Sequence, residues 1–104
     1  MQEFRNYLGQ SIRLTDERVE HIHTHPRMTS LLPEIPGTLV DPEQVIRSRS
    51  DPDVHLYYRF LQGTVWGDKY LCIVVKSLFD DSFIITAYVT DTIKRGEILW
   101  IRNP

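Results

Sequence analysis

The feature that most constrains how this chain can fold is a set of four segments in which apolar and polar side chains alternate. These segments span residues 44–50, 54–61, 69–79 and 82–91. Such alternation is typical of β-strands, because successive side chains of a strand point to opposite faces of the sheet. Turns or short loops connect the segments, and strands joined in this way pair antiparallel. The sequence therefore predicts a four-stranded antiparallel sheet.

A helix is expected before these strands, over residues 15–25. Thr15 can cap its N-terminus, and Asp16 follows in the first turn, where the helix dipole favours acidic side chains. Pro26 cannot continue the helix and disfavours helical backbone at the residue before it. The helix should therefore end at His25.

A second helix of one or two turns is expected around residues 34–40, because Pro33 and Pro36 interrupt any longer pattern. Residues 4–15 should form two short extended pieces with a turn between them. The C-terminal tail should form a short strand or a docking segment. The predicted class is α+β, with N-terminal helices packed on one face of a four-stranded antiparallel sheet.

Composition places the chain among globular proteins. Its 104 residues are 41% hydrophobic and 25% charged, which predicts one folded domain over residues 1–104, and the net charge of -2 does not by itself indicate a nucleic acid partner. Cys72 is the only cysteine, so no intramolecular disulfide can form and the cytoplasm is the expected compartment. No apolar run is long enough to cross a membrane, and no signal peptide is recognised at the N-terminus.

The alternation also divides the predicted sheet into two faces. Apolar side chains such as Leu56, Ile73 and Ala87 should face the helices. The other face should be basic and rich in hydroxyl groups, and it should carry His55, Tyr57, Arg59, Lys76, Thr86, Tyr88 and Thr90. Arg47 and Arg49 belong to the first strand, whose faces the pattern does not assign. A cationic face with hydroxyl groups suits a phosphate ligand, and the alternative is an ordinary solvated sheet face.

The stretch HIHTHP, at residues 21–26, places three histidines close together. His21 and His25 are about one helical turn apart and should share a face, whereas His23 should point elsewhere. A metal site would need a third ligand, and His55 is the only other histidine, so metal coordination is the weaker interpretation and no cofactor is predicted. His25 is interpreted either as a helix cap or as a titratable group for acid–base chemistry.

Four segments of the chain resemble, in the same order, the phage-type branch of the barnase–EndoU–colicin–RelE nuclease-like superfamily. They read IRLTDERVEHIHTHP, SDPDVHLYYR, KYLCIVVK and FIITAYVTDTIKRGEILW. The resemblance implies a barnase-like or RelE-like fold and a metal-independent ribonuclease, associated with phages or toxin systems. Carried over by position, it implies catalytic roles for residues of one helix and of the sheet: His21, His25, Arg59, Lys76, and Thr86 or Tyr88. RNA is then the expected partner, together with a cognate antitoxin or immunity protein.

In a metal-independent ribonuclease, the ribose 2′-hydroxyl attacks the adjacent phosphorus. His25 is expected to act as acid or base, Arg59 to bind the phosphate and Lys76 to stabilise charge in the transition state. The remaining candidates are assigned to substrate binding: Tyr57, His55, Thr90, Arg47 and Arg49. The alternative is a non-catalytic module that keeps the fold and binds RNA or protein. Convergence of His25, Arg59 and Lys76 in one cleft would favour catalysis, and their separation would favour binding.

Overall fold

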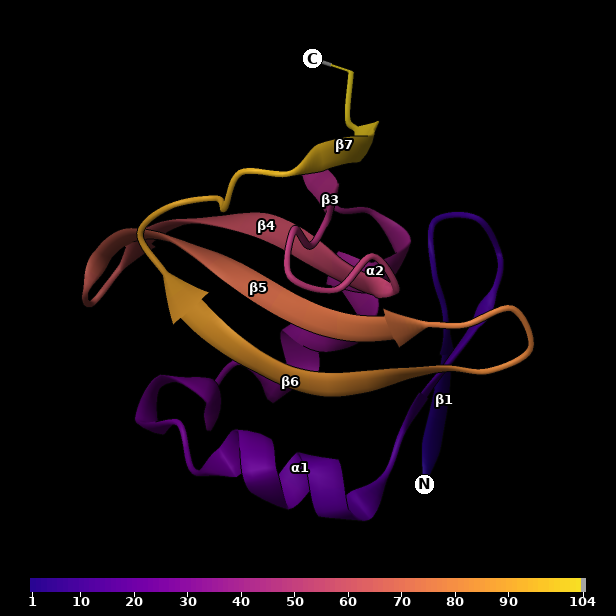
Figure 1. Ribbon diagram of the computed structural model, residues 1–104. Helices are drawn as coiled ribbons and strands as arrows, with labels where there is room; N and C mark the ends of the chain where they lie inside the picture. The colour runs from indigo at the N-terminus through magenta and orange to yellow at the C-terminus, as the bar shows by residue number, and fades with distance from the viewer. Residues whose placement is uncertain (104) are drawn as a thin grey trace.

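A seven-stranded sheet and two short α-helices make up the protein (Figure 1). The computed structural model describes residues 1–103. In chain order the strands are β1 (Gln2–Arg5), β2 (Ser11–Leu14), β3 (Gln44–Arg47), β4 (Val54–Thr64), β5 (Gly67–Ser77), β6 (Ser82–Thr90) and β7 (Glu97–Ile101). Their order across the sheet is β1-β2-β6-β5-β4-β3-β7, and neighbours are antiparallel except for β2 and β6, which are parallel.

The prediction of a four-stranded antiparallel sheet is wrong, although its four segments do form β3 to β6 with the expected antiparallel pairing. The hairpin of β1 and β2 joins the sheet beside β6, and β7 joins it beside β3. β2 runs parallel to β6, with Arg13 opposite Phe83. Alternation within a segment indicates that it forms a strand but not which strand it pairs with. The positions of β1, β2 and β7 depend instead on contacts between distant parts of the chain.

The first predicted helix is present as α1 (Asp16–His23). It begins at the predicted cap, because Thr15 Oγ1 accepts a hydrogen bond from the backbone of the first turn at 3.2 Å. It ends before the predicted boundary at His25. Thr24 caps the last turn instead, with its hydroxyl donating to the His21 carbonyl oxygen at 2.6 Å.

The second predicted helix is confirmed as α2 (Ile35–Val40), which follows two 3-10 turns, η1 (Pro26–Met28) and η2 (Leu32–Glu34). Each of these three elements carries a proline in its first turn. Proline is accepted there, but it cannot lie inside a continuing helix, so this region is divided into short pieces. Among the described residues, no helix has the length and apolar character needed to span a bilayer.

The main apolar cluster lies between the helices and the sheet, on the side that we call the helix face. Ile22 of α1 and Leu39 of α2 are fully buried there, in one cluster with Leu71 and Ile73 of β5. Side chains from both helices and from the sheet thus share one core. This packing fixes α1 beside β6 and α2 beneath the centre of the sheet (Figure 1).

The opposite side of the sheet, which we call the open face, carries a smaller apolar cluster. Tyr58 of β4 and Cys72 of β5 are buried in it, and Ile93 packs over them from the segment between β6 and β7. Figure 1 shows this segment crossing in front of the sheet, with α2 behind. The backbone N–H of Lys94 donates to Tyr58 Oη at 3.1 Å and holds the segment in place.

The predicted faces of β4 are inverted. Tyr57 is paired with Ile73 and Arg59 with Leu71, and both partners belong to the helix-face core. His55, Tyr57 and Arg59 are therefore on the helix face, whereas Leu56 and Tyr58 are on the open face. The physical reason is that both faces of β4 are apolar and buried at its centre, so alternation does not identify the face that meets the helices.

An ion pair ties β2 to the turn between β5 and β6. Arg13 Nε lies 2.9 Å from Asp81 Oδ1, and Arg13 Nη2 lies 2.8 Å from Oδ2. The hydrogen bonds from this guanidinium lower the pKa of the Asp81 carboxyl below its ordinary value. Arg13 also lies over the Phe83 ring, 5.5 Å from its centroid. The contact therefore reinforces the parallel pairing of β2 and β6.

We expect Asp81→Asn to reduce the acid sensitivity of the fold. Because the folded-state pKa of Asp81 is lowered, the pair contributes its full stability above the pKa of the unfolded residue. That contribution is lost as the pH falls through the folded-state pKa, below about pH 4. Tm measured by circular dichroism from neutral to acidic pH should fall less in Asp81→Asn than in the wild type. Asp80→Asn is the matched control, and an equal fall in Asp81→Asn and wild type would contradict the prediction.

Candidate functional site

The structure separates the two cations that were predicted to bind one phosphate. Arg59 is on the helix face, where its guanidinium lies against Gly37 of α2, so that an added Cβ would come within 2.8 Å of Nη1. Lys76 is on the open face and forms an ion pair with Asp51 at 2.6 Å. The sheet lies between them. The predicted cleft of His25, Arg59 and Lys76 is therefore not formed.

The hydroxyl residues predicted for the sheet face do lie together on the open face. Thr86, Tyr88 and Thr90 of β6 share this face with Lys76. Their surroundings are those of a packed cluster, because Tyr88 packs against the cluster of Tyr58 and Cys72, and burial raises its pKa. Thr86 Oγ1 is buried and has no hydrogen-bond partner among residues 1–103. These groups form part of the packing of the open face rather than an exposed phosphate site.

Cys72 lies at the centre of this cluster and is fully buried. Burial raises the pKa of its thiol to about 11, although hydrogen bonds from the Tyr88 and Tyr58 hydroxyls act in the opposite direction. The reactive form of cysteine is the thiolate, and a buried neutral thiol is inert. Cys72 is therefore a packing residue in this fold.

The candidates on the helix face also have structural contacts. Tyr57 is buried, its hydroxyl accepts a hydrogen bond from Asn6 Nδ2 at 3.0 Å, and burial raises its pKa to about 12. His55 is half-buried, and its pKa is lowered by burial and then by the charge of Arg47. Arg47 pairs with Glu97 at 2.8 Å. Tyr57 is thus unable to stack on a base from solution.

Arg49, the last of the predicted binding residues, is exposed in the turn between β3 and β4. It forms no ion pair with any of residues 1–103. It is therefore a useful reference cation, because its removal changes the net charge without disturbing a contact.

The two histidines predicted to share a helix face are in contact, although α1 ends at His23 and His25 lies in extended backbone just beyond it. The ring centroids of His21 and His25 are 5.7 Å apart, with their planes at 89°. His21 is exposed and His25 half-buried, so solvent reaches the pair. Within the described part of the chain no group of three metal-ligating side chains occurs. Imidazole nitrogens that solvent reaches can donate or accept hydrogen bonds and can take part in proton transfer.

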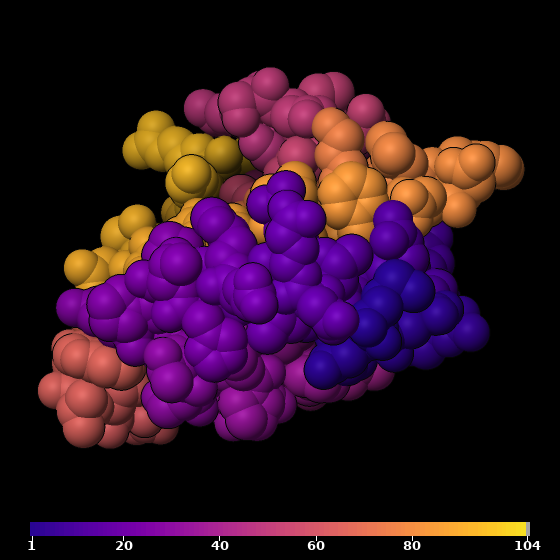
Figure 2. All heavy atoms as spheres, turned by 90° about the horizontal axis from the view of Figure 1, so that it is seen from below, coloured from indigo at the N-terminus to yellow at the C-terminus, as the bar shows by residue number. Residues whose placement is uncertain are grey.

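A second contact, made by a residue two positions after His25, was not foreseen from the sequence. Arg27 of η1 lies over the Trp66 ring in the turn between β4 and β5, with its Cζ 5.1 Å from the ring centroid. Figure 2 shows this turn next to the segment that follows α1. Trp66 remains 38% exposed. We call His21, His25, Arg27 and Trp66 the histidine–arginine surface.

Further charges lie close to this surface. Asp91, at the end of β6, is bonded to Lys69, and its pKa is lowered first by Lys69 and to a smaller extent by Arg27. Two cations therefore face one carboxylate in this region. Asp68 at the start of β5, which accepts a hydrogen bond from the Gly63 backbone N–H at 2.8 Å, adds a second carboxylate, so the formal charges of these four groups balance. An anionic ligand would therefore depend on the Arg27 guanidinium itself rather than on a net positive field.

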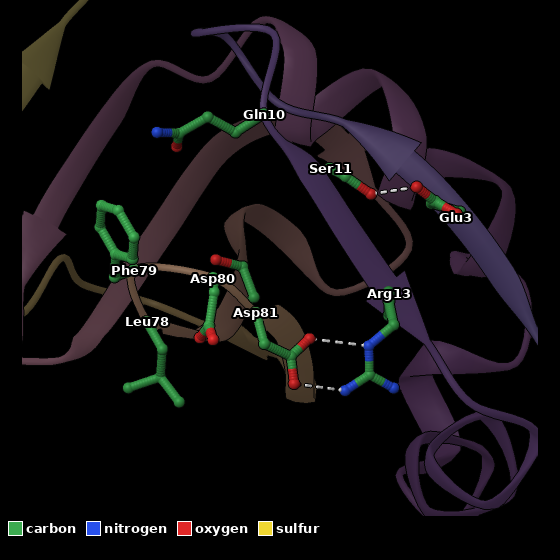
Figure 3. Close-up of a pocket in the computed structure, with 9 residues that line it drawn as sticks. Glu3, Gln10, Ser11, Arg13, Leu78, Phe79, Asp80 and Asp81 are labelled. Atoms are coloured by element: carbon green, nitrogen blue, oxygen red, sulfur yellow. Dashed lines mark hydrogen bonds and ion pairs between the residues drawn. The ribbon is translucent and has the colours of Figure 1, made fainter.

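A cavity of about 400 Å³ lies between the β1–β2 hairpin and the turn between β5 and β6 (Figure 3). The Arg13–Asp81 pair forms part of its wall, and Glu3 and Asp80 also line it. It contains none of the residues proposed from the sequence for catalysis or binding. Because its carboxylates outnumber its cations, it does not suit an anionic substrate.

Comparisons of the chain with protein-family models, with curated proteins and with solved structures found no match. The resemblance to the nuclease-like superfamily therefore stays a prediction.

Proposed function

We propose that the protein binds single-stranded RNA on the histidine–arginine surface. The observation that carries the proposal is the stacking of Arg27 on the partly exposed Trp66, two residues along the chain from the contact pair of His21 and His25. A guanidinium can bind a phosphate in bidentate fashion, and an exposed indole can stack on an unpaired base. Imidazole N–H groups can add hydrogen bonds to the backbone. RNA is favoured over other anions by the resemblance of the chain to ribonucleases.

The separation of Arg59 from Lys76 supports binding over the catalytic arrangement predicted first. A phosphoryl transition state needs positive charge held close to the acid and base. Arg59 and Lys76 are each engaged by local contacts on opposite faces of the sheet. Arg27 is the cation next to His25 in the sequence. It can bind an RNA phosphate without a rearrangement of the sheet.

We expect purified protein to bind a fluorescein-labelled single-stranded RNA in EDTA, measured by fluorescence anisotropy. Trp66→Ala and Arg27→Ala should each raise Kd by about tenfold, because each removes a stacking or phosphate contact. Arg49→Ala is the matched control for the loss of one positive charge, and it should leave Kd nearly unchanged. If all three variants raised Kd equally, RNA binding would not depend on the Arg27–Trp66 contact. That result would contradict binding at the proposed surface.

Ribonuclease activity is the second candidate function, and the contact of His21 with His25 favours it. One neutral imidazole would take the proton of the ribose 2′-hydroxyl as its oxygen bonds to phosphorus. The other, protonated, would give a proton to the 5′-oxygen as the P–O5′ bond breaks. The products would be a 2′,3′-cyclic phosphate and a free 5′-hydroxyl, with no metal required.

Product analysis in EDTA separates the two functions. Cleavage to 2′,3′-cyclic phosphates that is lost in His25→Gln and in His21→Gln, but retained in His23→Gln, would establish the enzyme. His23 is exposed on the same helix and lies outside the contact pair, so it is the matched control. RNA binding without cleavage by the wild type would establish the non-catalytic module.

A further inference from the structure

An apolar hairpin tip projects from the turn between β5 and β6. Phe79 is fully exposed and Leu78 is 40% exposed. Figure 3 shows both side chains pointing away from the Arg13–Asp81 pair. Asp80 follows them, also exposed, and forms no ion pair within residues 1–103. Exposed large apolar side chains on a tight turn do not stabilise a monomer, so the tip has the character of a docking element.

An apolar cavity that could receive such a tip lies on the open face. Its volume is about 480 Å³, within the range of ligand-binding pockets and therefore large enough for a phenyl ring. Its apolar wall is formed by Phe60, Tyr70, Ile93 and Ile101. Phe60 and Ile101 remain 39% and 54% exposed, and Phe60 contacts Tyr70 with ring centroids 5.4 Å apart. An aromatic side chain entering this cavity would meet aromatic and aliphatic partners.

The charges around the two features are of opposite sign. Lys94 and Arg95 directly follow Ile93 at the cavity, and neither forms an ion pair in the described part of the chain. Arg102, which lines the cavity, pairs with both Glu43 and Asp41 at 3.1 Å. With Lys94 and Arg95, which follow Ile93 along the chain, the three cations near the cavity outnumber these two carboxylates, whereas the hairpin tip carries the carboxylate of Asp80. Opposite charges of this kind guide and orient association.

We propose that the chain forms a dimer in which the hairpin tip of each copy, residues 78–80, occupies the open-face cavity of the other. The tip follows Ser77, the last residue of β5, whereas Tyr70 of the cavity lies near Gly67, its first residue. A twofold axis between two copies can therefore place each tip over the partner's cavity. Because each copy both donates a tip and accepts one, the dimer is closed. If each copy gave its tip to a different neighbour, the copies would form an open-ended polymer instead. The inference is independent of RNA binding, since the interface residues lie outside the histidine–arginine surface.

Sedimentation velocity over a wide range of protein concentrations tests the dimer. The wild type should pass from monomer to dimer, and Phe79→Ser and Ile101→Ser should each raise the dissociation constant by about tenfold or more. Val65→Ser is the matched control, because Val65 is 91% exposed in the turn between β4 and β5 and has no part in the interface.

Charge reversal tests the pairing of the tip with the cavity rim. Asp80→Lys should weaken the dimer, and adding Lys94→Glu to the same chain should restore it. A wild type that is monomeric at all concentrations would overturn the proposal. So would a dimer that Phe79→Ser leaves unchanged, or a charge reversal that the second substitution does not rescue.

Discussion

Asn6→Ala should lower the free energy of unfolding by about 2–3 kcal/mol, a large effect for a residue in a hairpin turn. Asn6 is only 4% exposed. Its Oδ1 accepts hydrogen bonds from the backbone N–H groups of Leu8 and Gln10 at 3.0 and 2.8 Å. Its Nδ2 donates to Tyr57 Oη at 3.0 Å and to Gln10 Oε1 at 3.1 Å. Alanine removes all four bonds and leaves the backbone donors of the turn without their acceptor. Urea unfolding at neutral pH measures the loss.

Two related variants separate the turn from the core contact. Tyr57→Phe removes only the hydroxyl acceptor and should cost about 1 kcal/mol. Gln10→Ala removes one exposed acceptor and should cost less than about 1 kcal/mol. If Asn6→Ala were no more destabilising than Gln10→Ala, the buried amide would not organise the hairpin, contrary to this prediction.

The turn of the β1–β2 hairpin also contacts the far edge of the sheet. β1 and β7 are the two edges of the sheet, yet the Tyr7 ring of the β1–β2 turn lies 5.3 Å from the Trp100 ring of β7. Tyr7 also packs edge-on against Tyr57 at 5.8 Å. The turn therefore reaches beneath β4 to the far edge, and Asn6 anchors it there. No local pattern predicts this contact, because it joins the two ends of the chain.

Local signals were sufficient where one residue or one short pattern determines the structure. Thr15 predicted the beginning of α1 because a hydroxyl at that position can accept the free N–H groups of the first turn. Pro33 and Pro36 predicted a short second helix for steric reasons. The four alternating segments predicted β3 to β6 and their antiparallel pairing.

The same alternation failed where both faces of a strand are buried. Leu56, Tyr57 and Tyr58 are consecutive and all buried, because α2 covers one face of β4 and the β6–β7 segment covers the other. Assigning the wrong face to β4 placed Arg59 beside Lys76 in the predicted site, whereas the sheet separates them. The predicted pairing of Arg59 with Lys76 therefore depended on the face assigned to a single strand.

The histidine–arginine surface was predicted only in part. The four-residue spacing of His21 and His25 predicted a shared helix face. Their rings do meet, but α1 ends at His23, so the contact joins the last turn of α1 to the residue before η1. The contact of Arg27 with Trp66 depends on how η1 packs beside the β4–β5 hairpin, and nothing in either segment indicates it. A surface formed by two turns that are distant in sequence can be recognised only from the tertiary structure.

Ile22→Ala is expected to lower the free energy of unfolding by about 3 kcal/mol and to weaken RNA binding as well. Ile22 is the fully buried residue of α1, at 0% exposure. A helix of this length is unstable by itself in water, so its position depends on packing against the sheet. Truncation removes that anchor and leaves a cavity in the helix-face core. His21 precedes Ile22 directly, so a loosened α1 would no longer hold the imidazole pair beside Arg27.

His23→Ala provides the matched control on the same helix, because His23 is exposed and its substitution should change the free energy of unfolding by less than about 0.5 kcal/mol. Denaturant unfolding and RNA anisotropy, measured on both variants below the unfolding transition, distinguish anchoring from direct contact. Weaker RNA binding by folded Ile22→Ala, with His23→Ala unchanged, is the expected result, since Ile22 cannot touch a ligand. If Ile22→Ala lost stability but bound RNA as tightly as the wild type, α1 would contribute nothing to the surface, and the RNA contact would reduce to Arg27 and Trp66.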